Sequence, residues 1–343
     1  MLDEFPESLL KYRTRIDAAM RQVIERQSSG LRQMMEYHLG WTDEKGESVE
    51  SSTAKRVRPT LCILACEALG GDFQTCMPNA VAVELIHNFS LIHDDIQDGS
   101  PERHNRSTVW WLWGPAQAIN AGDSMHTLAH LAIYDLREQG VPPAKIERAL
   151  KLLDLTALEL CEGQYLDIDF QDRLDISVEA YLHMASLKTG ALIACALQLG
   201  ALVATDDEAT ISAFGEAGRK FGIAFQIHDD LLDLWTAPGI SQPMPPGDIL
   251  SKKKTLPVIY SIEHGDVHQK RQLGTLYMKR VLDPTDVPHV LGIMDELGAK
   301  QFAESQIVTL WNDALETLET ATTAIGATRL LKEVAEFLIF HSR

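Results

Sequence analysis

Apolar residues recur at three- and four-residue intervals over long stretches of this chain, a spacing that places them on one face of a helix. The windows TALELCEGQYL (156–166) and AFGEAGRKFGIAFQIHDDLLDLW (213–235) show it, whereas the alternating pattern of strands is hard to find. With 343 residues, 45% of them hydrophobic, the chain can bury a large core. We therefore expect one all-α domain over residues 1–343, interrupted by polar loops near 41–55 and 236–252.

Charge and hydropathy exclude several classes of partner. A net charge of −18 argues against non-specific binding to nucleic acid or to an anionic membrane. The segment GALIACALQLGALVA (190–204) is nearly all apolar, but its 15 residues at about 1.5 Å each fall short of a bilayer core of roughly 30 Å. It predicts a buried core helix rather than a membrane span. The start, MLDEFPESLLKYRTRID, lacks the pattern of a signal peptide, so we expect a cytoplasmic protein.

The cysteines give no sign of a metal or disulfide framework. No CxxC pair occurs among the five cysteines, Cys62, Cys66, Cys76, Cys161 and Cys195. They are predicted to be reduced thiols that pack as small hydrophobic side chains.

Two similar segments, LIHDDIQDGS (91–100) and QIHDDLLDLW (226–235), each place three aspartates in apolar surroundings. Unpaired charge is costly there, so something positive must lie between the clusters. Each cluster pairs two aspartates at i and i+4, about 40° apart on a helix. Such oxygen-bearing faces suit Mg²⁺, which binds a few carboxylates together with substrate phosphates. The six aspartates are Asp94, Asp95, Asp98, Asp229, Asp230 and Asp233.

Two other interpretations of these aspartates stay open from the residues alone. Either cluster by itself could be a solvated helix edge or a cap. His93-Asp94 and His228-Asp229 could also be the metal-binding pairs of a phosphohydrolase. That function needs further ligands at suitable spacing, and the other histidines are scattered.

Cations gather near both clusters, although the chain is acidic overall. A lysine or arginine in a loop is usually solvated surface, but those flanking two carboxylate clusters indicate a cage for a diphosphate. The cations in question are Lys55, Arg58, Arg103, Arg106, Lys188, Lys252, Lys253 and Lys254.

With these residues in view, the sequence resembles the trans-isoprenyl diphosphate synthase, or polyprenyl synthetase, family. The matching blocks follow the family's order over nearly the whole chain: KRVRPTLCILACEALGGD, ELIHNFSLIHDDIQD, the GD of NAGDSM, EGQYLDIDF, SLKTG, FQIHDDLLD and KKKTLP. The resemblance implies a helical bundle of the isoprenoid synthase type around a deep central cavity, normally a homodimer. It is most similar to the short-chain farnesyl and geranylgeranyl diphosphate synthases.

The resemblance also implies a chemistry. The six aspartates would hold an allylic diphosphate through three Mg²⁺ ions, and Arg103, Lys188 and Lys253 would help draw off the diphosphate as leaving group. Preorganised positive charge aimed at the developing anion is the main catalytic device. The resulting carbocation would react head-to-tail, 1′-4, with isopentenyl diphosphate.

Further residues are implied to bind the two substrates. Isopentenyl diphosphate would be held by Lys55, Arg58 and His87, with a contact from His104. Spacing supports His87 independently, because it precedes Asp94 by seven residues and lies only about 20° away around an ideal helix. Gln226 lies about 60° from Asp229 by the same geometry. Thr189, Gln164 and Asp167 match cavity-lining family positions, although they could equally be polar groups that pack helices together.

The chain departs from the family pattern at two places. His104 stands where a second adjacent arginine is usual, and we expect the contact to be weaker unless Arg106 reaches back to replace the charge. The segment SQPMPPGD (241–248) lacks the family's Gly-Lys, so a lysine of the allylic site is missing. Both departures affect substrate details and leave the reaction class unchanged.

The residues just before the first aspartate cluster bear on the length of the product. Phe89 and Ser90, five and four residues before the first aspartate, match positions that set chain length, and they favour the twenty-carbon product over the fifteen-carbon one. On an ideal helix Phe89 lies about 140° from Asp94, so its role rests on the resemblance. The alternatives are a class I terpene cyclase, which needs no isopentenyl site, and a non-catalytic subunit of a heteromeric synthase, in which degraded aspartate clusters are expected.

Overall fold

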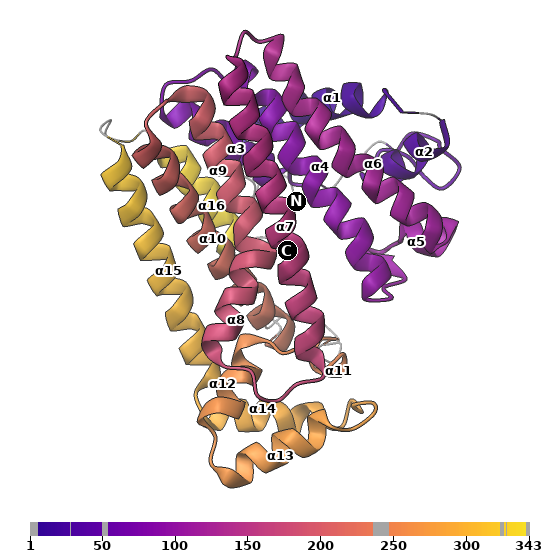
Figure 1. Ribbon diagram of the computed structural model, residues 1–343. Helices are drawn as coiled ribbons and strands as arrows, with labels where there is room; N and C mark the ends of the chain where they lie inside the picture. Colours follow the sequence, from indigo (N-terminus) through magenta and orange to yellow (C-terminus); the bar gives the residue numbers. More distant parts are fainter. Residues whose placement is uncertain are drawn as a thin grey trace. The chain divides into compact units, whose positions relative to one another are not determined.

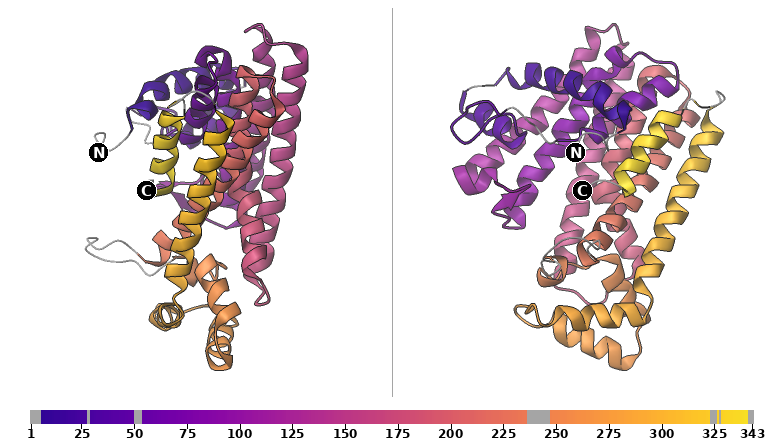
Figure 2. Two further views of the ribbon diagram at one scale, coloured as in Figure 1. Left: turned by 90° about the vertical axis from the view of Figure 1, so that its left-hand side faces the viewer. Right: turned by 180° about the vertical axis from the view of Figure 1, so that it is seen from behind.

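The computed structural model describes residues 6–27, 29–49, 54–235, 247–322, 326 and 328–340. The fold is all-α, as predicted, and the named strands within these ranges are two residues long (Figures 1 and 2). The chain forms two compact units. Unit 1 comprises Met1–Ala157, Leu192–Gly215 and Leu318–Leu338, and unit 2 comprises Leu158–Ala191, Glu216–Thr317 and Ile339–Arg343. The single domain expected from the sequence stays a prediction, as does its central cavity.

Unit 1 is built mainly from the first half of the chain. Its elements are α1 (Glu7–Ile24), α2 (Ser29–His38), α3 (Val57–Ala68), α4 (Phe73–Gln97), β1 (Glu102–Arg103), β2 (Arg106–Ser107), α5 (Val109–Trp113), α6 (Pro115–Tyr134) and the 3₁₀ turn η1 (Asp135–Arg137). Five further helices contribute to both units: α7 (Pro143–Gln171), α9 (Ala191–Ala204), α10 (Glu208–Leu234), α15 (Ala299–Ala321) and α16 (Arg329–Phe340).

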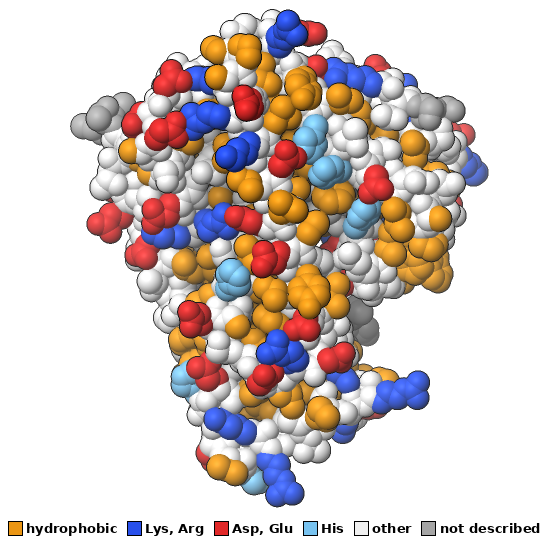
Figure 3. Space-filling model, viewed as in Figure 1, with side chains coloured by type: hydrophobic (Ala, Val, Ile, Leu, Met, Phe, Trp, Pro, Cys, Tyr) orange, Lys and Arg blue, Asp and Glu red, His pale blue; other side chains and the backbone are white. Residues whose placement is uncertain are grey.

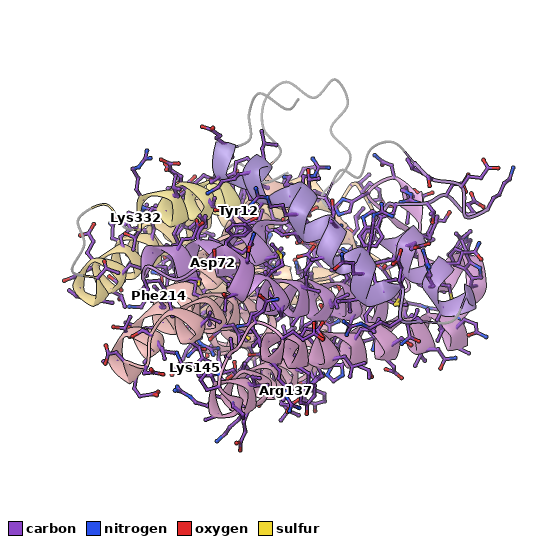
Figure 4. The ribbon with its side chains drawn as sticks, turned by 90° about the horizontal axis from the view of Figure 1, so that it is seen from above. Tyr12, Asp72, Arg137, Lys145, Phe214 and Lys332 are labelled. Carbon is purple, nitrogen blue, oxygen red and sulfur yellow. The ribbon has the colours of Figure 1, made fainter. Side chains whose placement is uncertain are left out.

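Helix α4 is central to unit 1 because it packs against α1, α3 and α6. Asp72 caps its start, accepting hydrogen bonds from the amides of Gln74 and Thr75. Tyr12 of α1 is fully buried, and its hydroxyl donates to Glu67 Oε1 at 2.6 Å. Phe214 of α10 is also fully buried. Both residues are labelled in Figure 4. Pro59 is the third residue of α3, in the first turn, where a proline is tolerated.

Unit 2 carries the remaining elements, α8 (Val178–Ala185), the π-helix η2 (Ser186–Gly190), α11 (Gly247–Leu250), α12 (Leu256–His264), α13 (Val267–Tyr277) and α14 (Val287–Glu296). Helix α12 packs against α8, α13 and α14. A core that includes Leu234, Ile249, Val258 and Leu273 holds these helices together. Much of the predicted loop after α10, residues 236–246, lies outside the described residues, and so do positions 50–53 of the first loop.

The apolar segment near residue 190 belongs to a longer helical run than the sequence argument assumed. The run Val178–Ala204 has 27 residues, and by length and composition it could cross a bilayer. The prediction based on 15 residues was therefore wrong about the length, because α8 and the π-helix continue directly into α9. Of its most apolar window, 72% is buried inside the structure, as expected of a core helix.

Four of the five cysteines are buried free thiols, as predicted. Cys62, Cys66 and Cys76 lie close together, with the Cys62 and Cys76 sulfurs 3.6 Å apart. Cys161 is exposed instead, so the prediction of a packed thiol was wrong there. The Cys66 pKa is raised by its hydrogen bond to Cys76 and by burial, which keeps this thiol protonated and unreactive.

Candidate functional site

The first acidic cluster lies at the carboxyl end of α4. Asp94 and Asp95 occupy its last turn, and Asp98 is the residue that caps it. Asp95 is 2% exposed, and its Oδ1 accepts from Arg103 Nε at 2.8 Å, while Arg103 Nη2 lies 3.6 Å from Asp94 Oδ2. Burial raises the pKa of Asp95, and Arg103 opposes this shift. Because a helix carries partial negative charge at this end, the cluster favours cations.

Arg103 comes from a short hairpin in which Glu102 pairs with Ser107 and Arg103 with Arg106. The two residues of its turn, His104 and Asn105, have φ of 51° and 59°. Positive φ at both turn residues is typical of a two-residue hairpin turn whose twist matches that of its strands. His104 is exposed, and its pKa is lowered by burial of part of the ring and by Arg103 and Lys55.

Arg106 does not replace the missing arginine in the way that the sequence suggested. Its guanidinium donates to the carbonyls of Tyr37 at 3.1 Å and Thr42 at 2.7 Å, and it stacks over the Tyr37 ring at 4.3 Å. These contacts direct it toward α2 and the turn that follows. Sequence spacing could not show this, because the partners are 64 and 69 residues away.

The second acidic cluster lies in the last two turns of α10. Asp230 is fully buried, and its carboxylate accepts from Tyr181 Oη at 2.5 Å, from Gln226 Nε2 at 3.1 Å and from Lys253 Nζ at 3.1 Å. Asp233 accepts from the amide of Asp248 at 2.8 Å. Asp229 is exposed. This cluster too stands at the negative end of a helix dipole.

Lys253 links the cluster to the start of α11, since Nζ also lies 3.2 Å from Asp248 Oδ2. Burial disfavours its charge, but Asp230 and Asp248 outweigh this and raise the Lys253 pKa well above its usual value. Burial raises the pKa of Asp248 to about 7, against the opposing effect of Lys253. Lys254 points elsewhere, because its Nζ donates to the Gln171 carbonyl at 2.7 Å.

The π-helix η2 presents the remaining predicted residues of unit 2. Lys188 Nζ donates to Asp167 Oδ2 of α7 at 2.5 Å. Thr189 Oγ1 donates to Gln226 Oε1 of α10 at 2.6 Å. Gln226 therefore connects Thr189 with Asp230. The buried side-chain nitrogen and oxygen of Gln164 have no hydrogen-bond partner in the described part of the chain, a state typical of groups that await a ligand or water.

A group of basic and imidazole side chains in unit 1 comes from the start of α3 and the middle of α4. Arg58 Nη1 lies 3.2 Å from His87 Nε2, and buried Arg58 Nε has no hydrogen-bond partner among the described residues. Burial, followed by Arg58, lowers the His87 pKa well below its usual value, so the ring is neutral. Lys55 Nζ lies 5.5 Å from the centre of the Phe337 ring, and burial lowers its pKa.

Three residues of this group were not predicted from the sequence. Arg56 has φ of 52° and pairs with Asp17 and Glu84, both at 2.8 Å. Asn88 Nδ2 donates to the Glu84 carbonyl at 2.7 Å. His38, the last residue of α2, hydrogen-bonds Asn88 and lies near Arg103, Arg56 and Arg106. Arg56 stood within the noted KRVRPT block, but no local pattern could have indicated His38.

Phe89 and Ser90 lie on α4 between His87 and the aspartates. The Phe89 ring packs edge-on against His93 and against His126 of α6, with centroids 5.1 Å apart in both cases. Ser90 Oγ donates to the His87 carbonyl at 2.8 Å. Their role in chain length stays a prediction.

The carboxylates fit a hard cation by the chemistry of their oxygens. Within the described ranges, no group of three or more His, Cys, Asp or Glu is gathered so that it could hold a metal ion on its own. Asp98 and Asp229 are nevertheless exposed, and the side chain of Asp94 is 21% exposed. Such a set suits Mg²⁺, which keeps several waters and completes its shell with substrate phosphates.

Comparison with known proteins decides the family. The sequence model of the family described as polyprenyl synthetase matches residues 40–294. The chain belongs to the polyprenyl synthetase family. It is 41% identical over 250 residues to a (2E,6E)-farnesyl diphosphate synthase of Mycobacterium tuberculosis, covering 73% of this chain and 68% of the relative. It is 35% identical to a geranylgeranyl diphosphate synthase of the same organism, covering 83% and 80%.

A solved structure agrees with this membership. A polyprenyl synthetase from Streptomyces coelicolor A3(2) superposes with a TM-score of 0.87 and 31% identity, covering 97% of this chain and 98% of that one. The present polyprenyl synthetase is thus a trans-prenyltransferase of the short-chain type. Its predicted residues form two groups. Unit 1 holds those from Lys55 to Arg106, and unit 2 holds those from Gln164 to Lys254.

Proposed function

We propose that this enzyme condenses isopentenyl diphosphate head-to-tail, 1′-4, with an allylic diphosphate to make a short-chain all-trans prenyl diphosphate. The observation that carries the proposal is the presence of two aspartate clusters at helix carboxyl ends, each with one buried carboxylate held by a cation, Asp95 by Arg103 and Asp230 by Lys253. A paired buried carboxylate keeps its neighbours oriented while the outer carboxylates meet the ligand.

The outer aspartates bind the allylic diphosphate through Mg²⁺ ions, and we propose that there are three of them. When bound, these ions neutralise the phosphate oxygens and stabilise the leaving group. Arg103 pairs with Asp94 and Lys253 pairs with Asp230, whereas Lys188 pairs with Asp167 of α7. We propose that these three cations orient the diphosphate. Thr189 and Gln226, which are joined by a hydrogen bond, would contact the same substrate. Positive charge fixed before reaction lowers the barrier because it needs no reorganisation.

Isopentenyl diphosphate is bound by Lys55, Arg58 and His87, with His104 at the hairpin. The buried Nε of Arg58, which lacks a partner among the described residues, supports this assignment because a diphosphate oxygen would satisfy it. His87 is neutral, so it can donate one hydrogen bond while Arg58 supplies the charge.

The bond changes balance within the two substrates. The allylic C–O bond breaks and diphosphate leaves with the electron pair. The isopentenyl double bond then attacks the allylic cation at C1, forming the new C–C bond and a tertiary cation. Loss of a proton from this cation to the released diphosphate restores a double bond. The chain's own residues hold the two diphosphates and orient the reacting carbons.

We propose the twenty-carbon geranylgeranyl diphosphate as the main product and the fifteen-carbon farnesyl diphosphate as the alternative. Relatives named for each product are 35% and 41% identical to this chain. If Phe89 limits chain length, Phe89→Ser should shift the products longer, because one isoprene unit is comparable to a helical turn of roughly 5.4 Å. Chromatography of the dephosphorylated products decides. Unchanged lengths with a lower melting temperature would show that Phe89 only packs against His93 and His126.

We also propose a cytoplasmic homodimer. The face drawn in Figure 3 carries many hydrophobic side chains. In unit 1, α6 exposes Ile119 at 45%, Leu131 at 41% and Tyr134 at 56%, and neighbouring Leu155 of α7 is 49% exposed. Large apolar side chains collected in this way are typical of a protein interface. Light scattering behind size exclusion tests the dimer, and Leu131→Lys should weaken it.

The decisive experiment is incubation of the purified protein with Mg²⁺, isopentenyl diphosphate and each of dimethylallyl, geranyl and farnesyl diphosphate. The proposal predicts chain elongation. Cyclic or alcohol products would identify a terpene cyclase instead, and no turnover by the protein alone would identify a subunit of a heteromeric synthase. The missing loop lysine falls on residues 241–246, outside the described structure, so its effect is read from the Michaelis constant of the allylic substrate.

A further inference from the structure

The π-helix η2 places Lys188 and Thr189 in a wide turn inside an otherwise α-helical run. A π-turn bonds i to i+5 and so accommodates one residue more than an α-turn. The two side chains point to different helices, Lys188 to Asp167 of α7 and Thr189 to Gln226 of α10. The directions of both therefore depend on the wide turn being kept.

Arg219 of α10 contacts the beginning of this turn. Its Nη1 donates to the Ser186 carbonyl at 3.2 Å and lies 3.3 Å from Ser186 Oγ. Its Nη2 donates to Glu159 of α7 at 2.8 Å. One guanidinium thus ties the wide turn to two helices, which the planar fork of arginine can do and a single ammonium cannot. Arg219 precedes Gln226 by seven residues, so both lie on nearly the same face of α10.

The backbones of the same two helices approach the turn closely. A Cβ at Gly163 of α7 would lie 2.3 Å from the Lys188 amide nitrogen. A Cβ at Gly222 of α10 would lie 2.5 Å from Gly190 Cα. Both distances are far inside van der Waals contact, so these positions need glycine. The turn is held between α7 and α10 by close backbone packing on two sides, and Arg219 adds the polar tie.

We propose that Arg219 is a positioning residue for the allylic half of the site: it keeps the π-turn at Ser186–Gly190 in place and thereby directs Lys188 and Thr189. The inference rests on the proposed function, because the assignment of these two side chains to the allylic diphosphate comes from there. Arg219 itself touches no proposed substrate atom. Its loss allows the turn to relax toward an α-turn, which rotates the side chains that follow by about 100°, the angle between successive helical residues.

The test is a comparison of steady-state kinetics for both substrates. Arg219→Met keeps the length of the side chain and removes the guanidinium. We expect the Michaelis constant for geranyl diphosphate to rise, with kcat/KM down about 10- to 100-fold. The constant for isopentenyl diphosphate should change less than about twofold, because Lys55, Arg58 and His87 belong to the other group of residues. Arg219→Lys should recover part of the loss.

Three further measurements separate positioning from general damage. Arg173→Met is the matched variant, since Arg173 ends the same α7 region with two surface ion pairs, to Asp169 and Asp175, and should leave kinetics unchanged. Guanidinium at millimolar concentration should partly restore Arg219→Ala and leave Arg173→Ala unaffected. Gly163→Ala, which pushes on Lys188 from the opposite side, should show the same selective loss for geranyl diphosphate.

Failure of the positioning role can be distinguished from failure of the proposed function. If the wild type elongates geranyl diphosphate but Arg219→Met affects both substrates equally, or neither, the positioning role is wrong. If the wild type forms no prenyl diphosphate, the proposed function fails. Calorimetric binding of inorganic diphosphate with Mg²⁺ then decides on Arg219 alone. Weaker binding by Arg219→Met than by Arg173→Met supports positioning, and equal binding overturns it.

Discussion

The two aspartate clusters share a sequence pattern and differ in how they are held. At the end of α4, buried Asp95 has one cationic partner, Arg103, whose side chain is 30% exposed. At the end of α10, fully buried Asp230 accepts from a tyrosine, a glutamine and a lysine that come from three separate segments. Removing a buried carboxylate destabilises the protein more when several donors depend on it, because each donor is left without an acceptor. The second cluster is therefore more strongly preorganised than the first.

The middle and outer aspartates of each cluster also differ in burial. The middle residue is buried in both clusters, and the ones further along the helix are more exposed. We infer that Asp95 and Asp230 anchor their clusters, whereas the outer residues meet the metal and the diphosphate.

The largest effect is expected for the outer aspartates. Asp94→Ala and Asp229→Ala should each lower kcat by about 100-fold or more, because each removes a carboxylate that would hold Mg²⁺ against the leaving diphosphate. Far-UV circular dichroism should remain that of the wild type. Activity near the wild-type level in both variants, with Mg²⁺ as the metal, would contradict the proposed mechanism. Chelation should stop the wild-type reaction and Mg²⁺ should restore it.

Substitution of the two anchoring aspartates should lower the free energy of unfolding by different amounts. Asp230→Ala leaves Tyr181, Gln226 and Lys253 without their acceptor and should cost about 3–5 kcal/mol of unfolding free energy. Asp95→Ala leaves only the partly exposed Arg103 and should cost about 1–3 kcal/mol. Urea denaturation measures both. Equal losses would show that the additional donors around Asp230 contribute nothing to the difference between the clusters.

Acid should act on unit 1 through His38. Burial, with Arg103, Arg56 and Arg106 nearby, lowers the pKa of His38 to about 3. The unfolded chain therefore binds a proton between pH 6.5 and 3 that the folded chain does not, so stability is full above pH 6.5 and falls as pH decreases. The slope for one proton is about 1.4 kcal/mol per pH unit. His38→Gln should lose less stability between pH 7 and pH 5 than the wild type. A parallel loss would assign the acid sensitivity to other groups.

The smallest effect is expected at the hairpin turn. If His104 contacts isopentenyl diphosphate, His104→Arg should lower the Michaelis constant for that substrate a few-fold more than for the allylic one. The positive φ of 51° already tolerates a side chain, so the change in melting temperature should be small. Equal effects on both substrates, or none, would show that another group makes this contact.

Much of the fold was readable because helical periodicity is a local property. The caps, the proline at the start of α3 and the aspartate spacing all follow from neighbouring residues. The positions of Arg106, His38 and Arg219 depend instead on partners that are distant in sequence, such as Tyr37 for Arg106 and Ser186 for Arg219. The π-turn was equally hidden, because the letters SLKTG continue a helical pattern without a break. Cys161 is exposed although cysteine is usually buried, because residue type predicts burial only on average.

The ion pairs of Arg56 have a consequence for how the protein folds. This residue lies between Lys55 and Arg58 and pairs with Asp17 and Glu84, which are 39 and 28 residues away. Lys55 and Arg58 are therefore oriented only once these distant segments have met, and closing such loops is a slow, entropically costly event. Helix α1, which supplies Asp17, precedes the residues that match the family. The isopentenyl site should thus form late in folding. A variant that lacks α1 should become compact without forming the isopentenyl site.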